Sequence, residues 1–376
     1  MKVLLVEPPR GRKYHTTYPP LGLLKFSAYH KKKGDEVRLV QGFEDDNFEP
    51  NKIYITSLFT YAYEPVHEVI RFYSKKYRKA EIVVGGIYAT LCPEHLKEHF
   101  EDLKDRMRIH KGLCEKVENI MPDYSLFPDW KASIVFSSRG CVRKCPFCAV
   151  PILEPKFEAR KSIKNLIYPG HKKIVFWDNN ILASPYWENI FDELEELGLE
   201  VDFNQGLDAR LLTPCVAQKL KKLKLPLIRL AYDTLGVRKY VKSAIDILKE
   251  FGFKGRRILV YTLFNFPHQS DTPETFLQRM KDLMEWEVVA YPMRYQPLEP
   301  RPKNSYISPY WSYEELEMIA RARRVIGYGG AFPPYEGLRK KILKAKNFKQ
   351  AFKLRPPQNE QIKYFSDKKQ RTPKNP

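Results

Sequence analysis

Residues 139–148 read "RGCVRKCPFC" and place Cys141, Cys145 and Cys148, three of the chain's six cysteines, within eight positions. A structural zinc site usually takes four ligands in two separated pairs. No fourth cysteine lies near this stretch, and no histidine follows it within twenty residues. Three thiolates can hold three irons of a four-iron cluster and leave the fourth iron open for a ligand that is not protein. The stretch therefore predicts an iron–sulfur site with one open iron.

The composition indicates a folded chain without disulfides. With 376 residues, 43% of them apolar and 13% aromatic, the chain has room for two domains with their own cores. It opens with "MKVLLVEPP", which does not resemble a secretory signal. No apolar run is long enough to span a membrane. We therefore expect a cytoplasmic protein whose cysteines stay reduced and bind metal.

The net charge of +20 is concentrated at the C-terminal end. From Arg339 to Pro376 there are 13 Lys or Arg but only Glu360 and Asp367, a net charge of +11. A solvated tail and an arm that binds RNA phosphates would both have this composition. We expect residues 339–376 to be a basic extension separable from the folded cores, and nucleic acid to be a candidate partner of this tail.

The first part of the chain alternates short apolar runs with helical segments. The runs are "KVLLVEP", "EVRLV", "KIYITSLF" and "AEIVVGG", and "LGLLKFSAYHKKKG" has the apolar spacing of a helix that stops at Gly34. This alternation predicts an α/β fold with a doubly wound parallel sheet over residues 1–115. A proline-punctuated linker, residues 116–130, follows it.

A second alternating series covers residues 131–300. Its six strand candidates run from "ASIVFSSRG" to "EVVAYPMRYQPL" and are spaced as β/α units. Helix starts and stops are predicted by capping residues before prolines and by glycines: Ser184-Pro185, Thr213-Pro214, Thr272-Pro273, Gly198 and Gly252.

These units predict a partial (β/α)6 barrel, followed by a helical region and the basic tail over residues 301–376. Barrels of this kind carry their chemistry at the C-terminal ends of the strands. The cysteine stretch directly follows the first strand, so it lies at that edge.

The three cysteines form the pattern C-x3-C-x2-C, with Phe147 just before the last cysteine. This pattern after the first barrel strand resembles the radical S-adenosylmethionine (SAM) superfamily. The resemblance implies a 4Fe–4S cluster whose open iron binds the amino and carboxylate groups of SAM, with Phe147 in contact with SAM. An external one-electron reductant would supply the electron that breaks SAM into methionine and a 5′-deoxyadenosyl radical. A ferredoxin-like carrier would need a fourth cysteine, and neither Cys114 nor Cys215 has ferredoxin spacing.

Polar residues follow the second, third and fourth strands of the predicted barrel, in "FWDNN", "FNQGLDAR" and "LAYDT". The resemblance implies that such residues bind the amine, the carboxylate and the ribose hydroxyls of SAM. Some of these residues would equally well cap the following helix. The SAM-binding candidates are Asp178, Asn179, Asn180, Gln205, Asp208, Arg210 and Asp233.

The first domain resembles the cobalamin-binding domain that precedes the barrel in one class of the superfamily. In that class, Ser57 and the pair Gly85 and Gly86 would approach the corrin and its nucleotide tail. The D-x-H-x-x-G pattern of a lower axial ligand is absent, since His15 lacks those neighbours. The resemblance therefore implies cobalamin bound without a histidine lower ligand. A degenerate domain kept for packing or substrate binding is the alternative.

The resemblance covers roughly residues 1–300. Our leading hypothesis is a radical SAM enzyme that methylates an unactivated carbon with cobalamin as methyl carrier. A cobalamin-free radical SAM enzyme that modifies RNA is the second hypothesis. A non-catalytic iron–sulfur electron-transfer module is the third, and it would leave the polar strand ends without a purpose.

Overall fold

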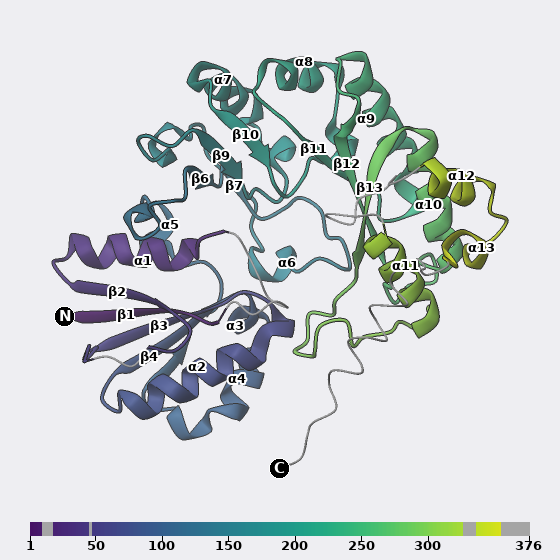
Figure 1. The fold of residues 1–376 in the computed structure, drawn as a ribbon. Helices are drawn as coiled ribbons and strands as arrows, with labels where there is room; N and C mark the ends of the chain where they lie inside the picture. Colours follow the sequence, from purple (N-terminus) through teal and green to yellow (C-terminus); the bar gives the residue numbers. More distant parts are fainter. Residues whose placement is uncertain (10–17, 45–46, 326–335, 355–376) are drawn as a thin grey trace, which may run out of the picture.

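The computed structural model describes residues 1–9, 18–44, 47–325 and 336–354. Figure 1 shows two α/β parts, with the N-terminal part (purple and blue) beside the larger part that holds the remaining elements. Each part is built on parallel strands.

The N-terminal part contains a five-stranded parallel sheet in the order β2-β1-β3-β4-β5, which confirms the predicted doubly wound fold. Its strands are β1 (Lys2–Glu7), β2 (Glu36–Gln41), β3 (Lys52–Ser57), β4 (Glu81–Gly86) and β5 (Met107–Ile109). Its helices are α1 (Leu21–Lys32), α2 (Tyr63–Lys76), α3 (Ile87–Leu91) and α4 (Pro93–His99). The short edge strand β5 is an addition to the predicted sheet.

Both faces of this sheet are covered by helices, as the near-continuous apolar strands require. In β1, Val3 and Leu5 pack against Leu23 of α1. Leu4 and Val6 point to the opposite face and belong to the cluster that α2 covers.

The larger part contains six parallel strands, which confirms the predicted partial barrel. They form two three-stranded sheets, β10-β9-β6 and β11-β12-β13. A backbone bond from Leu207 N to Arg229 O (2.8 Å) and a bridge between Glu200 and Lys224 connect the two sheets. The strands are β6 (Ala132–Val135), β9 (Lys173–Phe176), β10 (Glu200–Phe203), β11 (Ile228–Ala231), β12 (Gly255–Phe264) and β13 (Val288–Arg294).

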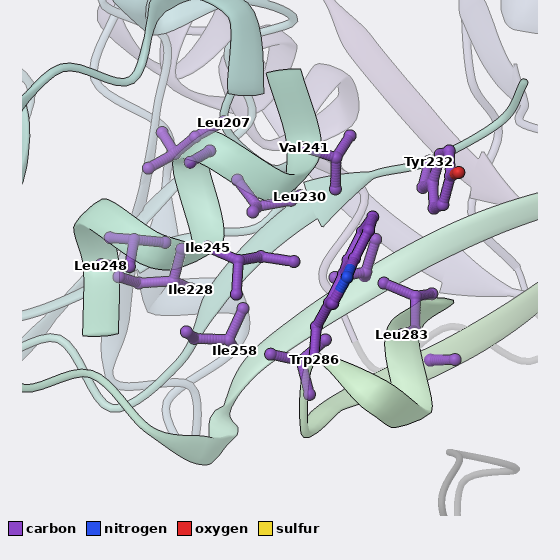
Figure 2. Close-up of a cluster of buried hydrophobic side chains, with 14 of the residues drawn as sticks. Leu207, Ile228, Leu230, Tyr232, Val241, Ile245, Leu248, Ile258, Leu283 and Trp286 are labelled. Carbon is purple, nitrogen blue, oxygen red and sulfur yellow. The ribbon is translucent and has the colours of Figure 1, made fainter. Parts of the chain in front are cut away.

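Helices cover the outside of the barrel and bury its apolar side chains. These helices are α7 (Trp187–Leu197), α8 (Pro214–Lys222), α9 (Arg238–Glu250) and α10 (Pro273–Glu285). Figure 2 shows the core where Leu230 of β11 meets Val241 and Ile245 of α9, with the ring of Tyr232 stacked on Trp286 at a centroid distance of 5.7 Å. This core fixes β11 and β12, whose C-terminal ends contribute to the site below.

The predicted helix limits hold at four of five positions. Thr213 caps α8 and Thr272 forms a capping box on α10. Gly198 (φ +60°) and Gly252 (φ +95°) adopt left-handed backbone where α7 and α9 end. Ser184 was expected to cap a helix, but its hydroxyl accepts from Tyr186 N (3.1 Å) in a preceding turn and α7 begins at Trp187.

The prediction that the basic extension separates from the core at Arg339 is wrong for residues 339–354. After α11 (Tyr313–Val325), the helices α12 (Glu336–Lys344) and α13 (Phe348–Phe352) pack on the barrel core. Ile342, Phe348 and Phe352 are fully buried. The basic residues of this stretch alternate with apolar ones that share one helix face, so charge and packing coexist. The rest of the predicted tail, residues 355–376, lies outside the described residues.

The two parts meet through the linker and through their sheet edges. Ser27 of α1 donates to Asp123 of the linker, with 2.6 Å between oxygens. At the C-terminal edges, the Cys92 thiol donates to Leu298 O (3.2 Å) and the Thr60 hydroxyl to Pro297 O (3.5 Å). The edge that follows β3 and β4 therefore faces the mouth of the barrel. Within the described ranges, no helix combines the length and the apolar character that crossing a bilayer requires.

Candidate active site

The cysteine stretch forms a loop whose two ends are hydrogen-bonded to each other. Its two ends pair as the short antiparallel strands β7 (Ser138–Arg139) and β8 (Glu158–Ala159), with α6 (Val150–Leu153) inside the loop. Gly140 has φ +72°, and a Cβ there would lie 2.2 Å from Lys156 O. Only glycine fits this close backbone approach, so Gly140 sets the direction in which the chain enters the loop.

The three cysteines are half-buried at the mouth of the barrel. Backbone N–H groups of Arg143 and Val150 donate to the sulfurs of Cys141 (3.3 Å) and Cys148 (3.5 Å). Burial, followed by the neighbouring Cys148 thiol, raises the pKa of the Cys145 thiol. The backbone of the loop therefore already supplies N–H donors to two of the three sulfurs.

The donor set fits a cluster better than a single ion. No three His, Cys, Asp or Glu side chains of the described ranges are arranged as ligands of one metal ion. A four-iron cluster instead takes each thiolate on a different iron, so its cysteines need not converge on one point. Three thiols with N–H donors on two sulfurs are consistent with that arrangement.

Asp208 lies at the centre of a polar network beside the cysteines. Its carboxylate accepts from Arg210 Nε (2.7 Å), Arg143 Nε (3.0 Å) and Asn180 Nδ2 (3.1 Å). Burial opposes ionisation of this buried carboxyl, but the hydrogen bonds from the two arginines keep the pKa of Asp208 below its usual range. Three predicted SAM-binding residues thus meet here, together with Arg143, which was not predicted.

Asn180 has a buried acceptor that the protein leaves unused. The residue is 4% exposed, and its Oδ1 has no hydrogen-bond partner among the described residues. A buried carbonyl without a donor is costly, and most such groups in folded proteins are paired. This oxygen lies beside the Asp208 carboxylate, so the position suits a donor such as the amine of a ligand.

Asp178, by contrast, uses its acceptors within the protein. Its carboxylate receives hydrogen bonds from the backbone N–H and the hydroxyl of both Ser137 and Ser138, at 2.5–2.9 Å. Burial raises the pKa of this carboxyl despite the four bonds. These contacts brace the end of β9 against the start of the cysteine loop, so the amine contact expected of Asp178 stays a prediction.

The other predicted residues make contacts outside the Asp208 network. Asn179 donates to Glu154 (3.0 Å), and the exposed Gln205 donates to Asn204 (3.2 Å). Phe147 packs edge-on against Phe266 of the loop after β12, with 5.8 Å between centroids.

Asp233 stands at the end of β11 and accepts from Leu263 N (2.9 Å). Burial raises the pKa of Asp233 to about 6, although Arg279 opposes this shift. Its link to Leu263 joins the ends of the fourth and fifth barrel strands. Its predicted contact with SAM remains a prediction.

At the N-terminal sheet edge, two predicted residues have internal roles. The Ser57 hydroxyl donates to Gly85 O (2.9 Å) and accepts from Ala89 N (3.0 Å). Gly86 has φ +106°, and a Cβ there would lie 2.3 Å from Ser57 O. These contacts join β3 to β4 and α3, so the cobalamin contacts expected of Ser57 and Gly86 are not visible in this packing and stay predictions.

His110, at the end of β5, was not predicted. Its Nε2 is buried without a partner among the described residues. A Cβ built on Gly85 would lie 3.7 Å from the Cβ of His110. A single histidine without a neighbouring motif gives no signal in the sequence, and only the pairing of β5 with β4 brings it to the C-terminal edge of the parallel strands, where sheets of this type bind ligands.

Comparison with known proteins supports the fold. No family model matches the chain. The ribosomal protein uS12 methylthiotransferase RimO of Helicobacter pylori is 24% identical over 171 residues, which is 40% of this chain and 39% of that relative. The chain thus matches about two fifths of the length of this curated relative. The radical SAM methyltransferase TsrM of Kitasatospora setae, solved with cobalamin and a [4Fe–4S] cluster bound, aligns with a TM-score of 0.60 at 14% identity. The alignment covers 78% of this chain and 72% of TsrM.

Over 78% of its length, the chain has the same fold as this methyltransferase. This confirms the fold that the sequence predicts. The cysteine loop contacts the Asp208 network through Arg143, and its helix α6 contacts α3, which follows β4 of the N-terminal sheet.

Proposed function

We propose that this chain is a radical SAM enzyme in which Cys141, Cys145 and Cys148 hold a 4Fe–4S cluster whose fourth iron takes SAM. The observation that carries this proposal is the unpartnered, buried Oδ1 of Asn180, whose amide donates to the same Asp208 carboxylate as Arg143 of the half-buried cysteine stretch. When bound, the cluster would supply the electron that cleaves a carbon–sulfur bond of SAM, and an external one-electron reductant would have to restore it.

In this proposal, the residues of the Asp208 network bind SAM and orient it. Asn180 Oδ1 accepts a hydrogen bond from the amine of SAM, and Arg210 faces its carboxylate. Asp208 holds Arg210, Arg143 and Asn180 in place through the three bonds given above. These groups are set before the ligand arrives, which lowers the entropy cost of ordering them.

We infer that the N-terminal domain binds cobalamin and that the enzyme transfers a methyl group to an unactivated carbon. The sheet edge after β3 and β4 faces the barrel mouth through Cys92 and Thr60, so a carrier held there would lie within reach of the SAM site. The unpartnered Nε2 of His110 next to Gly85 offers a polar contact at this edge. Enclosure between two domains would keep water from reactive intermediates.

The RNA-modifying alternative has less support than the sequence suggested. It depends on the basic tail, and residues 339–354 of that tail pack on the barrel core. Lys340, Lys344, Lys346, Lys349 and Lys353 stay exposed in this stretch, but on or next to helices anchored in the core, and the basic residues after Leu354 lie outside the described ranges.

Anaerobic reconstitution tests the proposed function. The chain is incubated with iron, sulfide and hydroxocobalamin, desalted, and examined by absorbance for cluster and corrin. SAM and dithionite are then added and 5′-deoxyadenosine and methionine are measured. We expect cluster, retained corrin and SAM cleavage. Cleavage without retained corrin would favour the cobalamin-free enzyme, and a cluster without any cleavage would leave the electron-transfer module as the better account.

A further inference from the structure

A row of ion pairs begins in the N-terminal domain and reaches the linker. Lys25 of α1 donates its Nζ to the backbone oxygen of Glu118 (2.6 Å) and lies 3.4 Å from its Oε2. Glu118 closes α5 (Glu115–Glu118), a short helix that contacts α1. The Lys25 side chain is 12% exposed and that of Glu118 is 19% exposed. Figure 1 shows α1 and α5 together beside β6.

The same carboxylate continues the row into the barrel. Glu118 Oε1 and Oε2 accept from Nε (2.8 Å) and Nη2 (2.9 Å) of Arg139, a two-pronged pairing that fixes the plane of the guanidinium. The guanidinium also lies over the Phe136 ring, 3.3 Å from its centroid. Arg139 is two positions before Cys141, so its position determines where the cysteine loop starts.

Glu154 joins the two ends of the loop. Its Oε1 accepts from Arg139 Nη1 (3.0 Å), and its Oε2 accepts from Gly140 N (2.6 Å) and from Asn179 Nδ2 (3.0 Å). Glu154 itself precedes the exit of the loop, and its carboxylate contacts the entry to the loop and the residue next to Asn180. The row runs without a break from Lys25 to Asn179.

The degree of burial decides how much these ion pairs contribute to stability. Exposed ion pairs add little because water and salt screen them. The side chains of this row are 12–19% exposed, so removing one member leaves a poorly solvated charge with one partner fewer. A second pair between the same helix and the same linker, Lys31 Nζ to Asp123 Oδ2 (2.7 Å), has a 44% exposed lysine and does not contact Arg139. It provides a natural control.

We propose that Lys25, Glu118, Arg139 and Glu154 are positioning residues through which the N-terminal domain holds the cysteine loop and Asn179 in place. None of them contacts the reacting groups; they act through the backbone of Gly140 and through the side chain of Asn179. The proposal rests on the proposed function only in taking this loop as the cluster site. Its contacts belong to the protein itself, so the chain without cofactors can test it.

Hydrogen exchange on the full chain without cofactors is the first test. We expect Lys25→Met and Glu118→Gln to speed amide exchange about tenfold in peptides covering residues 139–154, the effect of losing one charge-assisted hydrogen bond. Lys31→Met should leave those peptides unchanged, and Lys25→Arg should restore protection. Exchange in residues 139–154 that is equal in Glu118→Gln, Lys31→Met and the unsubstituted chain would overturn the proposal. A variant whose exchange rises throughout the chain has unfolded; if Glu118→Gln does so, Lys25→Met, which leaves the Glu118–Arg139 pair in place, is compared with Lys31→Met instead, and equal exchange in those two variants overturns the proposal.

The affinity for SAM is the second test. In reconstituted protein of equal iron content, we expect Glu118→Gln to raise the SAM Kd several-fold and Lys31→Met to leave it unchanged. Equal Kd values for the two variants would count against positioning of Asn179. If the unsubstituted chain binds neither iron nor SAM, the proposed function fails, whereas the exchange result still decides whether the row holds the loop.

Discussion

Asn180 donates to Asp208, with 3.1 Å between Nδ2 and Oδ2, and this bond directs the other side-chain atom of Asn180, Oδ1, into a buried position without a donor. The amide cannot turn round to satisfy Oδ1 without losing the bond to Asp208. The protein therefore keeps an acceptor ready next to the Asp208 network, and a ligand with an N–H group can use it.

Asn180→Ala should weaken SAM binding without loss of the cluster. One hydrogen bond from the iron-bound amine contributes about 1 kcal/mol, so we expect the SAM Kd to rise about fivefold. Equilibrium dialysis with reconstituted protein of known iron content measures this. Asn165→Ala, at an exposed position, is the control. An unchanged Kd in Asn180→Ala would show that the ligand amine binds elsewhere.

Phe352→Ala should destabilise the barrel. The side chain is fully buried against Phe276 and Phe348, so its loss leaves a cavity and should lower the free energy of unfolding by about 3–5 kcal/mol. Urea denaturation followed by fluorescence gives the value. A chain that ends after Leu354 should unfold like the full chain. A Phe352→Ala variant as stable as the parent would mean that α13 does not pack on the core in solution.

The N-terminal domain should lose stability as the pH falls from about 6.5 towards 4. Burial, followed by the charge of His99, lowers the pKa of His67 to about 4, while the same group in the unfolded chain titrates near 6.5. The unfolded state therefore binds more protons in this window and is favoured as the pH falls. Because His67 is only partly buried, we expect a loss of about 1–2 kcal/mol. His67→Gln should flatten this slope in denaturation series at several pH values, and the exposed His268→Gln should not; equal slopes would refute the assignment.

A bulky substitution at Gly85 should abolish corrin binding and leave the cluster chemistry unchanged. A Cβ at this position meets only His110, at an ordinary 3.7 Å, so Gly85→Ala should retain corrin after reconstitution and desalting. The bulk of Gly85→Trp should fill this part of the sheet edge and abolish retention, while iron content and SAM cleavage stay unchanged. Corrin bound equally by Gly85→Trp and by the parent would place the cofactor away from this edge.

Local sequence signals predicted helix ends correctly where the capping residue and the following proline alone determine the start of the helix. Thr213 and Thr272 cap their helices because a β-region residue before proline leaves the hydroxyl facing the free N–H groups. Ser184 has the same local sequence but forms a turn of its own, because the chain between β9 and α7 first makes the short helical turn Ile181–Ala183. Packing beyond the dipeptide decides between the two outcomes.

The site was predictable in its residue types but not in its connections. Polar residues after successive strands indicated a common edge, and Asn180, Asp208 and Arg210 do meet there. Nothing in the sequence distinguishes Asp178, which is saturated by two serines, from Asn180, which is not. Asp178 and Asn180 differ because Ser137 and Ser138, at the start of the cysteine loop, lie against Asp178. The spacing of residues in the sequence does not specify this contact.

The C-terminal helices also show a contact that the sequence did not predict. The charge of residues 339–376 suggested a solvated tail, yet Phe348 and Phe352 anchor its first part in the core. Net charge describes the exposed face of a short helix and gives no information on the buried one.

The central claim is that three cysteines alone hold a 4Fe–4S cluster and leave one iron to SAM. Electron paramagnetic resonance of the reduced, reconstituted protein, recorded with and without SAM, tests it most directly. We predict about four irons per chain, a signal that changes shape when SAM is added, loss of the signal in Cys141→Ala, Cys145→Ala and Cys148→Ala, and no change in Cys114→Ala or Cys215→Ala. A cluster signal that SAM does not alter, or one that also disappears in Cys114→Ala or Cys215→Ala, would contradict the open-iron account.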